Sequence, residues 1–320
     1  PEALTIAWTW SWVLIEPDPQ KNLIARLPPG VRIMSDWERG ARKKVCGKIY
    51  PLDEYSLSYP GPSPRFRRQL AIARKHGRHM MAKLQIGATH ELAAVPYLPV
   101  PQLLALKMSR MRQHKVDGYL ACWIFGGEVS PMSKVCGRMS RMPAMTPGRA
   151  IREVAEEEFG PQVAPAVVRA WAAFSAAWRK YPFSIPLVYY GPMNYATAYP
   201  LSLNMRKQAA PPGWLPLPRD GRGRLVLGDD LERWIEPFTP AVVTGAFRQL
   251  LTAWDKGLAI LQRLASAHPD HRRLTLEANL AKHIALSIQS TINIVEFYPL
   301  YREYRAAQAP EEKRRVLRKI

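Results

Sequence analysis

The sequence predicts an α/β fold in which parallel βα units of a partial (β/α)8 (TIM-type) barrel are followed by an α-helical region. Four short apolar runs lie in the first 130 residues, a helix-like stretch separates each run from the next, and each run ends in aromatic, carboxylate or amide residues. Strands that alternate with helices in this way pair in parallel through right-handed crossovers. We therefore expect a barrel part over residues 1–140 and a mainly helical region over residues 141–320.

The expected strands are the apolar runs near residues 5–11, 31–35, 80–86 and 117–124, adjacent in that order. Helices are expected between them over residues 17–27, 64–76 and 101–114, where apolar side chains recur near helical spacing. Pro28-Pro29-Gly30 and Gly77 mark two of the helix ends. The segment between the second strand and the second of these helices reads as a long loop.

Four strands do not close a barrel on their own, and a half-barrel leaves an apolar edge exposed. Three arrangements would resolve this: the chain is the C-terminal half of a longer barrel, it pairs with a second copy, or it forms a smaller open sheet. We favour the first arrangement. Self-association of the chain through its open sheet edge is the alternative.

The second region reads as helices that begin near residue 147 and continue over residues 163–179, 239–265 and 272–305. A nonhelical segment is expected from Ile185 to about Pro218, and the charged tail over residues 311–320 is expected to fray.

The composition allows a packed core but leaves a large positive charge to explain, with 47% hydrophobic residues and a net charge of +20. The three cysteines lack metal-ligand spacing, so we expect reduced or buried thiols and no metal. No signal peptide or run of about 18 apolar residues is found, so we expect no membrane segment and a bacterial cytoplasmic location. A basic surface raises the question of polyanion binding, but no nucleic-acid-binding module is found, so no specific nucleic-acid partner is expected.

Aromatic residues dominate the first apolar run, where Trp8, Trp10 and Trp12 alternate and would share one face of a strand. Indole rings on one face are suited to stacking on sugar rings, and Trp12, nearest the carboxyl end, is the best ligand candidate. Packing between the barrel and its helices is the competing interpretation.

Carboxylates follow the second strand, where alternation places Asp36 and Glu38 on one side with Trp37 between them. Retaining glycosidases hold two carboxyl groups about 5 Å apart, which is close to the spacing of such a pair. An ion pair with the adjacent Arg39 is the other interpretation.

Polar residues also follow the third strand, where Gln85 would bind a hydroxyl, His90 would act as acid or base and Glu91 as a nucleophile. A helix-capping charge is the alternative role for Glu91. Trp123 lies late in the fourth strand and would form the floor of a sugar site, unless it is a core residue.

Several segments resemble bacterial glycoside hydrolases that have a (β/α)8 barrel of the hexosaminidase type and a helical C-terminal region. The similar segments are residues 35–40, 55–63, 82–92, 95–99, 123–127 and 189–194. The resemblance implies the second half of such a barrel, with Trp residues at strand ends and Tyr190 and Asn194 reaching over its mouth. The carboxylate pair that these hexosaminidases carry on their fourth strand has no counterpart upstream of Trp8.

These observations together predict a glycoside hydrolase that cleaves a glycosidic bond by carboxylate catalysis, without a cofactor and with a carbohydrate substrate. The predicted catalytic residues are Asp36, Glu38 and Glu91, and the predicted substrate-binding residues are Trp12, Trp37, Gln85, His90, Trp123, Tyr190 and Asn194. The alternative is a noncatalytic carbohydrate- or polyanion-binding protein on a degenerate barrel.

Overall fold

A parallel sheet forms the centre of the N-terminal part in the computed structural model, which describes residues 3–121, 127–195 and 231–319. Its strand order is β1-β2-β5-β6, with bounds β1 (Ile6–Trp8), β2 (Arg32–Asp36), β5 (Met80–Lys83) and β6 (Tyr119–Leu120). All three pairings are parallel, so the predicted order and direction of the strands are confirmed. The described strands form an open sheet, not a closed barrel.

Helices connect these strands as the sequence predicts, with bounds α1 (Lys21–Arg26), α2 (Pro64–Lys75) and α3 (Pro101–Gln113). Helix α2 begins sharply because the Ser63 hydroxyl accepts the Phe66 N–H at 3.0 Å and Pro64 occupies the first turn. Beyond its end, Gly77 adopts a φ of +63°, a left-handed conformation that favours glycine.

Two segments differ from the sequence prediction. The first strand ends at Trp8, and residues Thr9–Leu14 form the 3₁₀ helix η1, so Trp12 does not share a strand face with Trp8. The expected long loop contains an antiparallel hairpin of β3 (Ala41–Val45) and β4 (Lys48–Leu52). Its strands are rich in Lys and Arg, which hid them from a search for apolar runs.

The two faces of the sheet have different characters. Ile33, Met80, Ala82 and Leu84 lie on the face that packs against the helices, and each is 0% exposed. The parallel register pairs Trp8 with Met34 and Asp36 with Lys83, and side chains alternate along each strand. The other face therefore carries Trp8, Met34, Asp36 and Lys83, and becomes polar toward the carboxyl edge.

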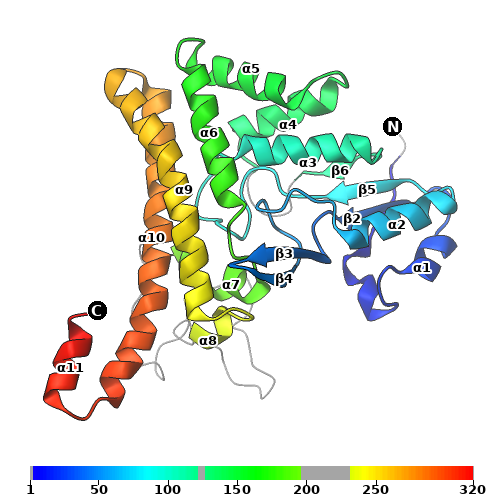
Figure 1. The fold of residues 1–320 in the computed structure, drawn as a ribbon. Coiled ribbons are helices and arrows are strands. Elements are labelled where there is room, and N and C mark those ends of the chain that lie inside the picture. Colours follow the sequence, from blue (N-terminus) through cyan, green and yellow to red (C-terminus); the bar gives the residue numbers. More distant parts are fainter. Residues whose placement is uncertain (1–2, 122–126, 196–230, 320) are drawn as a thin grey trace.

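The remaining chain is helical, and Figure 1 shows α9 and α10 as a long antiparallel pair with α6 against α9. Its elements are α4 (Pro131–Arg141), α5 (Pro147–Phe159), α6 (Ala164–Trp178), α7 (Ile185–Tyr190), η2 (Pro192–Tyr195), α8 (Leu231–Trp234), α9 (Pro240–Ala267), α10 (Arg272–Ala306) and α11 (Pro310–Leu317). The predicted helical region is confirmed, but two details were wrong: α7 and η2 replace the expected nonhelical start, and α11 replaces the frayed tail.

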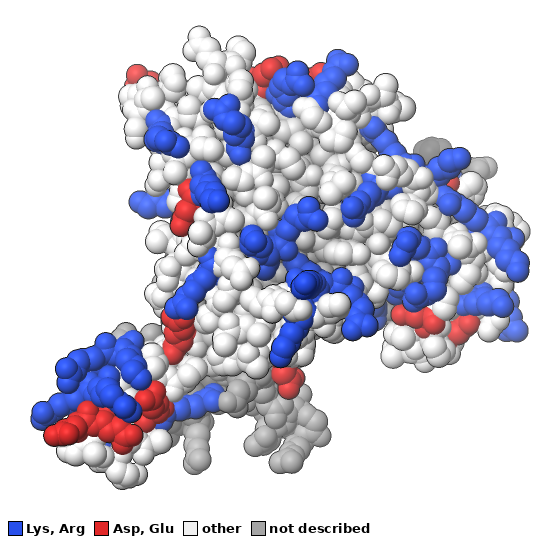
Figure 2. Space-filling model, viewed as in Figure 1, with Lys and Arg blue, Asp and Glu red and all other residues white. Residues whose placement is uncertain are grey.

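One hydrophobic core runs through both parts, from Ile24 beside the sheet to Tyr298 in α10. Near β1 the surface is apolar instead, where five aliphatic side chains are more than two-fifths exposed: Leu4, Ile6, Val13, Leu14 and Ile15. This surface fits the predicted open edge, and self-association through it stays a prediction. Elsewhere Lys and Arg side chains spread over the face in Figure 2. None of the described helices combines the length and the apolar character needed to cross a bilayer.

Candidate functional site

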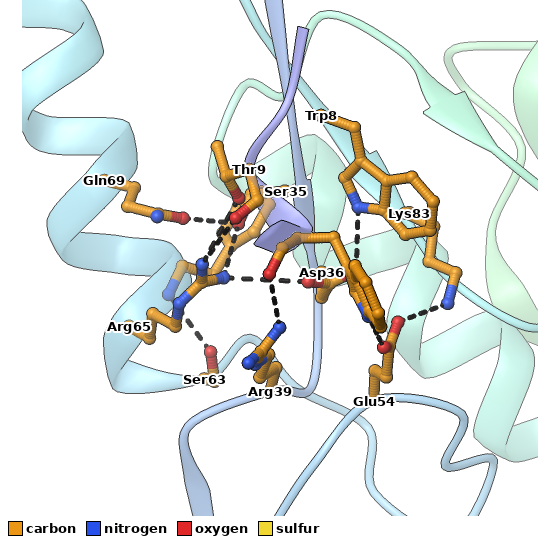
Figure 3. Close-up of polar contacts among 12 residues, drawn as sticks. Trp8, Thr9, Ser35, Asp36, Arg39, Glu54, Ser63, Arg65, Gln69 and Lys83 are labelled. Atoms are coloured by element: carbon orange, nitrogen blue, oxygen red, sulfur yellow. Dashed lines mark hydrogen bonds and ion pairs between the residues drawn. The ribbon is translucent and has the colours of Figure 1, made fainter. Parts of the chain in front are cut away.

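Charged and aromatic side chains converge at the carboxyl edge of the sheet (Figure 3). Trp8, Asp36 and Lys83 are the last residues of β1, β2 and β5, and all three lie on the face away from the helices. Glu54 joins them from the segment that follows β4, and contacts Lys83. Residues from four separate segments therefore meet at one place, as the carboxyl edge of a parallel sheet allows.

Asp36 is fully buried yet keeps one carboxylate oxygen without a hydrogen-bond partner among the described residues. Its Oδ1 accepts the indole N–H of Trp8 at 3.0 Å. Its Oδ2 accepts no hydrogen bond, and the guanidinium of Arg65 lies 3.8 Å from it. A buried acceptor in this state is available to a proton or to a ligand hydroxyl.

Arg65 is held rigidly behind Asp36 by neutral and charged acceptors. It lies in the first turn of α2 with its side chain 1% exposed. Its Nε donates to Asp18 at 2.6 Å, and its Nη1 and Nη2 donate to the Ser35 hydroxyl at 3.2 Å and to the Thr9 carbonyl at 3.3 Å. These contacts fix the direction of the guanidinium, so a positive charge stays beside Asp36.

Glu54 is buried next to a second carboxylate and under an aromatic side chain. Its Oε2 accepts a hydrogen bond from the Lys83 ammonium at 2.6 Å, and its Oε1 accepts one from the indole N–H of Trp10. Burial and the neighbouring charge of Asp36 raise the pKa of Glu54 to about 8, although Lys83 acts in the opposite direction. Burial and the nearby charge of Asp36 both disfavour the charged form of Glu54, so its carboxyl group holds a proton near neutral pH.

Aromatic rings enclose the ammonium of Lys83 beside this pair. Its Nζ lies 3.7 Å from the centroid of the Tyr55 ring and 5.4 Å from that of Trp8, distances at which a cation is attracted to a ring face. His90 packs edge-on between Tyr55 and Tyr189, with 4.6 Å between centroids on each side. Burial, followed by the charge of Lys83, lowers the pKa of His90 to about 4, so this imidazole is neutral at neutral pH.

Glu38 and Glu91, both predicted as catalytic, each receive a hydrogen bond, and the Oε2 of Glu38 accepts none from the described residues. Glu38 pairs with the ammonium of Lys107 from α3, and both side chains are 0% exposed. The strand β2 ends at Asp36, so the alternation that would place Asp36 and Glu38 on one side stops there. Glu91 accepts the Ser56 hydroxyl at 2.8 Å and the Trp178 indole N–H at 2.8 Å. The contacts of Glu91 are typical of a structural carboxylate.

Glu91 also fixes the segment that follows Glu54. It accepts the backbone N–H groups of Leu57 and Ser58, both at 3.1 Å. A buried carboxylate that receives several donors organises a loop, because each donor would otherwise be left unpaired.

The predicted substrate-binding residues separate into two groups. His90 lies beside Tyr55 at the site, and Gln85 is 2% exposed with an Oε1 that accepts no hydrogen bond from described residues. Trp37 instead faces the core: it is 0% exposed, donates to the Pro60 carbonyl at 3.0 Å, and packs edge-on against Phe66. The reason is alternation, which turns Trp37 to the opposite side of the sheet from Asp36.

The other predicted binding residues lie farther from the carboxyl pair or outside the description. Trp12 is half-buried in η1, and Tyr190 is half-buried at the end of α7. Asn194 joins η2 to the loop after β5, since its Oδ1 accepts the Ala93 N–H at 2.7 Å. Trp123 lies outside the described residues.

Sequence reasoning missed several side chains that form the site. The largest omission is Glu54, which follows a hairpin that the sequence did not reveal. One signal was available: Lys83 interrupts the apolar run Met80-Met-Ala-Lys-Leu84, and a lysine inside a buried strand needs an acidic partner. Trp10, Tyr55 and Arg65 gave no comparable signal.

No group of His, Cys, Asp and Glu side chains suited to a metal ion occurs within residues 3–121, 127–195 and 231–319. Comparison with known proteins adds no identification, because no family model, curated protein or solved structure matches this chain. The likeness to bacterial glycoside hydrolases stays a hypothesis, and the contacts at the sheet edge are what support a function.

Proposed function

We propose that this protein is a glycoside hydrolase whose acid–base pair is Asp36 and Glu54. The observation that carries the proposal is the pair itself: two buried carboxyl groups at the carboxyl edge of a parallel sheet, of which Glu54 has a pKa raised to about 8. Glycosidic bond cleavage needs one carboxyl group that gives a proton to the leaving oxygen and one carboxylate that stabilises or attacks the sugar. A pair that holds one proton supplies both forms.

The fold is compatible with this chemistry, because the open sheet has four parallel strands with polar residues at their carboxyl edge, half the number of strands in a (β/α)8 barrel. We propose that the sheet is part of such a barrel. Catalytic residues in these barrels come from the ends of several strands, as Asp36 and Lys83 do here.

In the proposed reaction, the protonated carboxyl group gives its proton to the glycosidic oxygen as the bond from that oxygen to the anomeric carbon breaks, and the remaining carboxylate stabilises the positive charge on the sugar ring. Water then forms the new bond to the anomeric carbon and returns a proton to the pair. Arg65 lies 3.8 Å from Asp36, and Lys83 orients Glu54. The Oε1 of Gln85 is an acceptor for a sugar hydroxyl. Trp10 is 46% exposed and donates to Glu54, so a sugar ring would replace its indole at that carboxyl group.

The test measures hydrolysis of a panel of α- and β-linked nitrophenyl glycosides by the wild type and by Asp36→Asn and Glu54→Gln. Each substitution should lower turnover at least about a hundredfold, the lower end of what general acid–base groups contribute. Asp53→Asn is the matched control, since Asp53 adjoins Glu54 in the chain and pairs with Arg39 at 3.5 Å. Folded Asp36→Asn and Glu54→Gln variants with wild-type turnover would remove the pair from catalysis.

A noncatalytic carbohydrate-binding protein is the second candidate, favoured by the deep burial of Asp36, which is 0% exposed. In that case the panel is not hydrolysed, while oligosaccharides still bind and quench the fluorescence of Trp8 and Trp10.

A further inference from the structure

A group of cationic side chains lies on the outer surface between α2 and α3, away from the carboxyl pair. We define this group as the α2–α3 cationic patch, formed by Arg67, Arg74, Arg110, His114 and Lys115. Arg67 and Arg74 are two helical turns apart on α2, and Arg110 and His114 are one turn apart on α3, so each pair shares a helix face. Figure 2 shows Lys and Arg side chains gathered over the part of the surface that α2 forms.

Backbone carbonyl groups hold two of these cations in place. The guanidinium of Arg74 donates to the Lys115 carbonyl at 3.1 Å and to that of His114, where it caps the end of α3. The guanidinium of Arg110 donates to the Gly61 carbonyl. Because Arg has five donors in a planar fork, each group keeps donors for an oxyanion after these contacts.

No carboxylate among the described residues forms an ion pair with any member of the patch, which sets it apart from the cations of α4 and α5. His114 is surrounded by positive charge: burial, and then Arg67, Arg74 and Arg110, lower its pKa. Uncompensated like charges at short range repel each other, and an anion that binds among them removes that repulsion.

The chemistry of the neighbouring surface favours an anionic sugar chain over a nucleic acid. Single-stranded nucleic acids are held by aromatic rings on which bases stack. Among the Phe, Tyr and Trp side chains whose burial the structure describes, Trp10 alone is exposed, and it lies at the carboxyl edge of the sheet. The patch thus offers donors for oxyanions but no exposed Phe, Tyr or Trp ring for bases.

The patch and the carboxyl pair are joined by one short segment, in which Glu54 lies at one end and Gly61 at the other. Helix α2 also contributes to both the carboxyl pair and the patch, because Arg65 in its first turn lies beside Asp36 and Arg67 is exposed on the outer surface. We propose that the α2–α3 cationic patch binds the sulfate or carboxylate groups of an acidic polysaccharide and so makes such polysaccharides the substrate class of this protein. This substrate assignment rests on the proposed function.

The test compares the binding of four fluorescently labelled probes to the whole chain at physiological salt: a heparin oligosaccharide, a hyaluronan oligosaccharide of equal length, uncharged dextran, and a single-stranded DNA with the same number of charges. The sulfated probe should bind, and its affinity should fall as salt is raised. Hyaluronan binding would show that carboxylates suffice, whereas binding of heparin alone would assign the patch to sulfate.

The decisive variant is Arg67→Glu/Arg74→Glu, which should weaken heparin binding at least about tenfold, the factor expected when a charge-assisted hydrogen bond is lost. Lys256→Glu/Arg263→Glu is the matched control, because these exposed residues of α9 have the same spacing and the same change in charge. The control should bind like the wild type.

The proposal would be overturned if both double variants weakened heparin binding equally, or if the DNA bound more tightly than heparin. Heparin binding is measured without hydrolysis, so this result can be interpreted even if the proposed hydrolysis fails. Conversely, hydrolysis of uncharged glycosides without any heparin binding would retain the proposed function and remove the substrate class.

Discussion

Two regions of this molecule bury a glutamate among aromatic residues, and they differ in whether a second carboxylate lies beside it. In the helical region, Glu277 of α10 accepts the Trp171 indole N–H at 2.7 Å and the Tyr97 hydroxyl, and burial raises its pKa. At the sheet edge, Glu54 faces a second carboxylate as well as donors, and its pKa rises to about 8. Glu277 joins three segments of a core, whereas Glu54 belongs to a pair whose like charges oppose each other.

This difference separates structural from chemical roles. A carboxylate that stabilises a fold is supplied with donors, because leaving either partner unpaired is costly. Glu277 and Glu91 follow this rule. Two carboxylates that share a buried site are unfavourable for folding, and such sites are typical of proton-transfer chemistry.

The largest expected effect on stability concerns Glu91, one of the structural carboxylates. Glu91→Leu should lower the free energy of unfolding by about 3 kcal/mol or more, since several buried donors lose their acceptor. These donors are the Ser56 hydroxyl, the Trp178 indole and the N–H groups of Leu57 and Ser58. Urea unfolding measures the change, and Glu91→Gln, which keeps one acceptor oxygen, should lose clearly less. A loss below about 1 kcal/mol for Glu91→Leu would contradict the structural role.

A second effect, of intermediate size, is the pH dependence of stability that Glu54 causes. The folded-state pKa of Glu54 is raised from 4.5 to about 8, so the folded protein binds this proton more tightly than the unfolded chain. The stability that this proton contributes is present below about pH 4.5 and is lost as the pH rises through about 8. Relative to wild type, Glu54→Gln should therefore gain at least about 1 kcal/mol of stability between pH 5 and pH 8.5.

Thermal or urea unfolding across this pH range checks the prediction. His90 acts in the opposite direction, because its folded-state pKa is lowered from 6.5 to about 4, and stability is lost as the pH falls through that range. Both proteins contain His90, so its contribution cancels in the difference. A difference between wild type and Glu54→Gln that does not change with pH would show that Glu54 titrates normally in the fold.

The smallest expected effect is that of Trp10→Phe, which keeps an aromatic ring and removes the N–H that donates to Glu54. Trp10 is 46% exposed, so stability should change by no more than about 0.5 kcal/mol. The pKa of Glu54 should rise further, because the lost donor favours the charged carboxylate. A lower pKa of Glu54 in this variant, seen by titration, would contradict the contact.

The sequence predicted the sheet better than the site, for reasons that particular residues show. Strand order followed from apolar runs and intervening helices, and Asp36 was found because it ends a strand. Glu54 was missed because it reaches Asp36 only through the β3–β4 hairpin, a nonlocal contact across strands rich in Lys and Arg. Glu38 was placed beside Asp36 because alternation was extended past the end of β2. Trp37 was assigned as a sugar-stacking ring, but its side chain faces the core.

The measurement that tests the central claim most directly is a titration of Glu54 itself. Its side-chain carboxyl carbon, labelled with ¹³C, would be followed by NMR from pH 4 to 10 in the wild type and in Asp36→Asn. The raised pKa of Glu54 predicts a midpoint near 8 in the wild type and a lower midpoint once the neighbouring charge is removed. A midpoint near the ordinary value of 4.5 in both proteins would contradict the account.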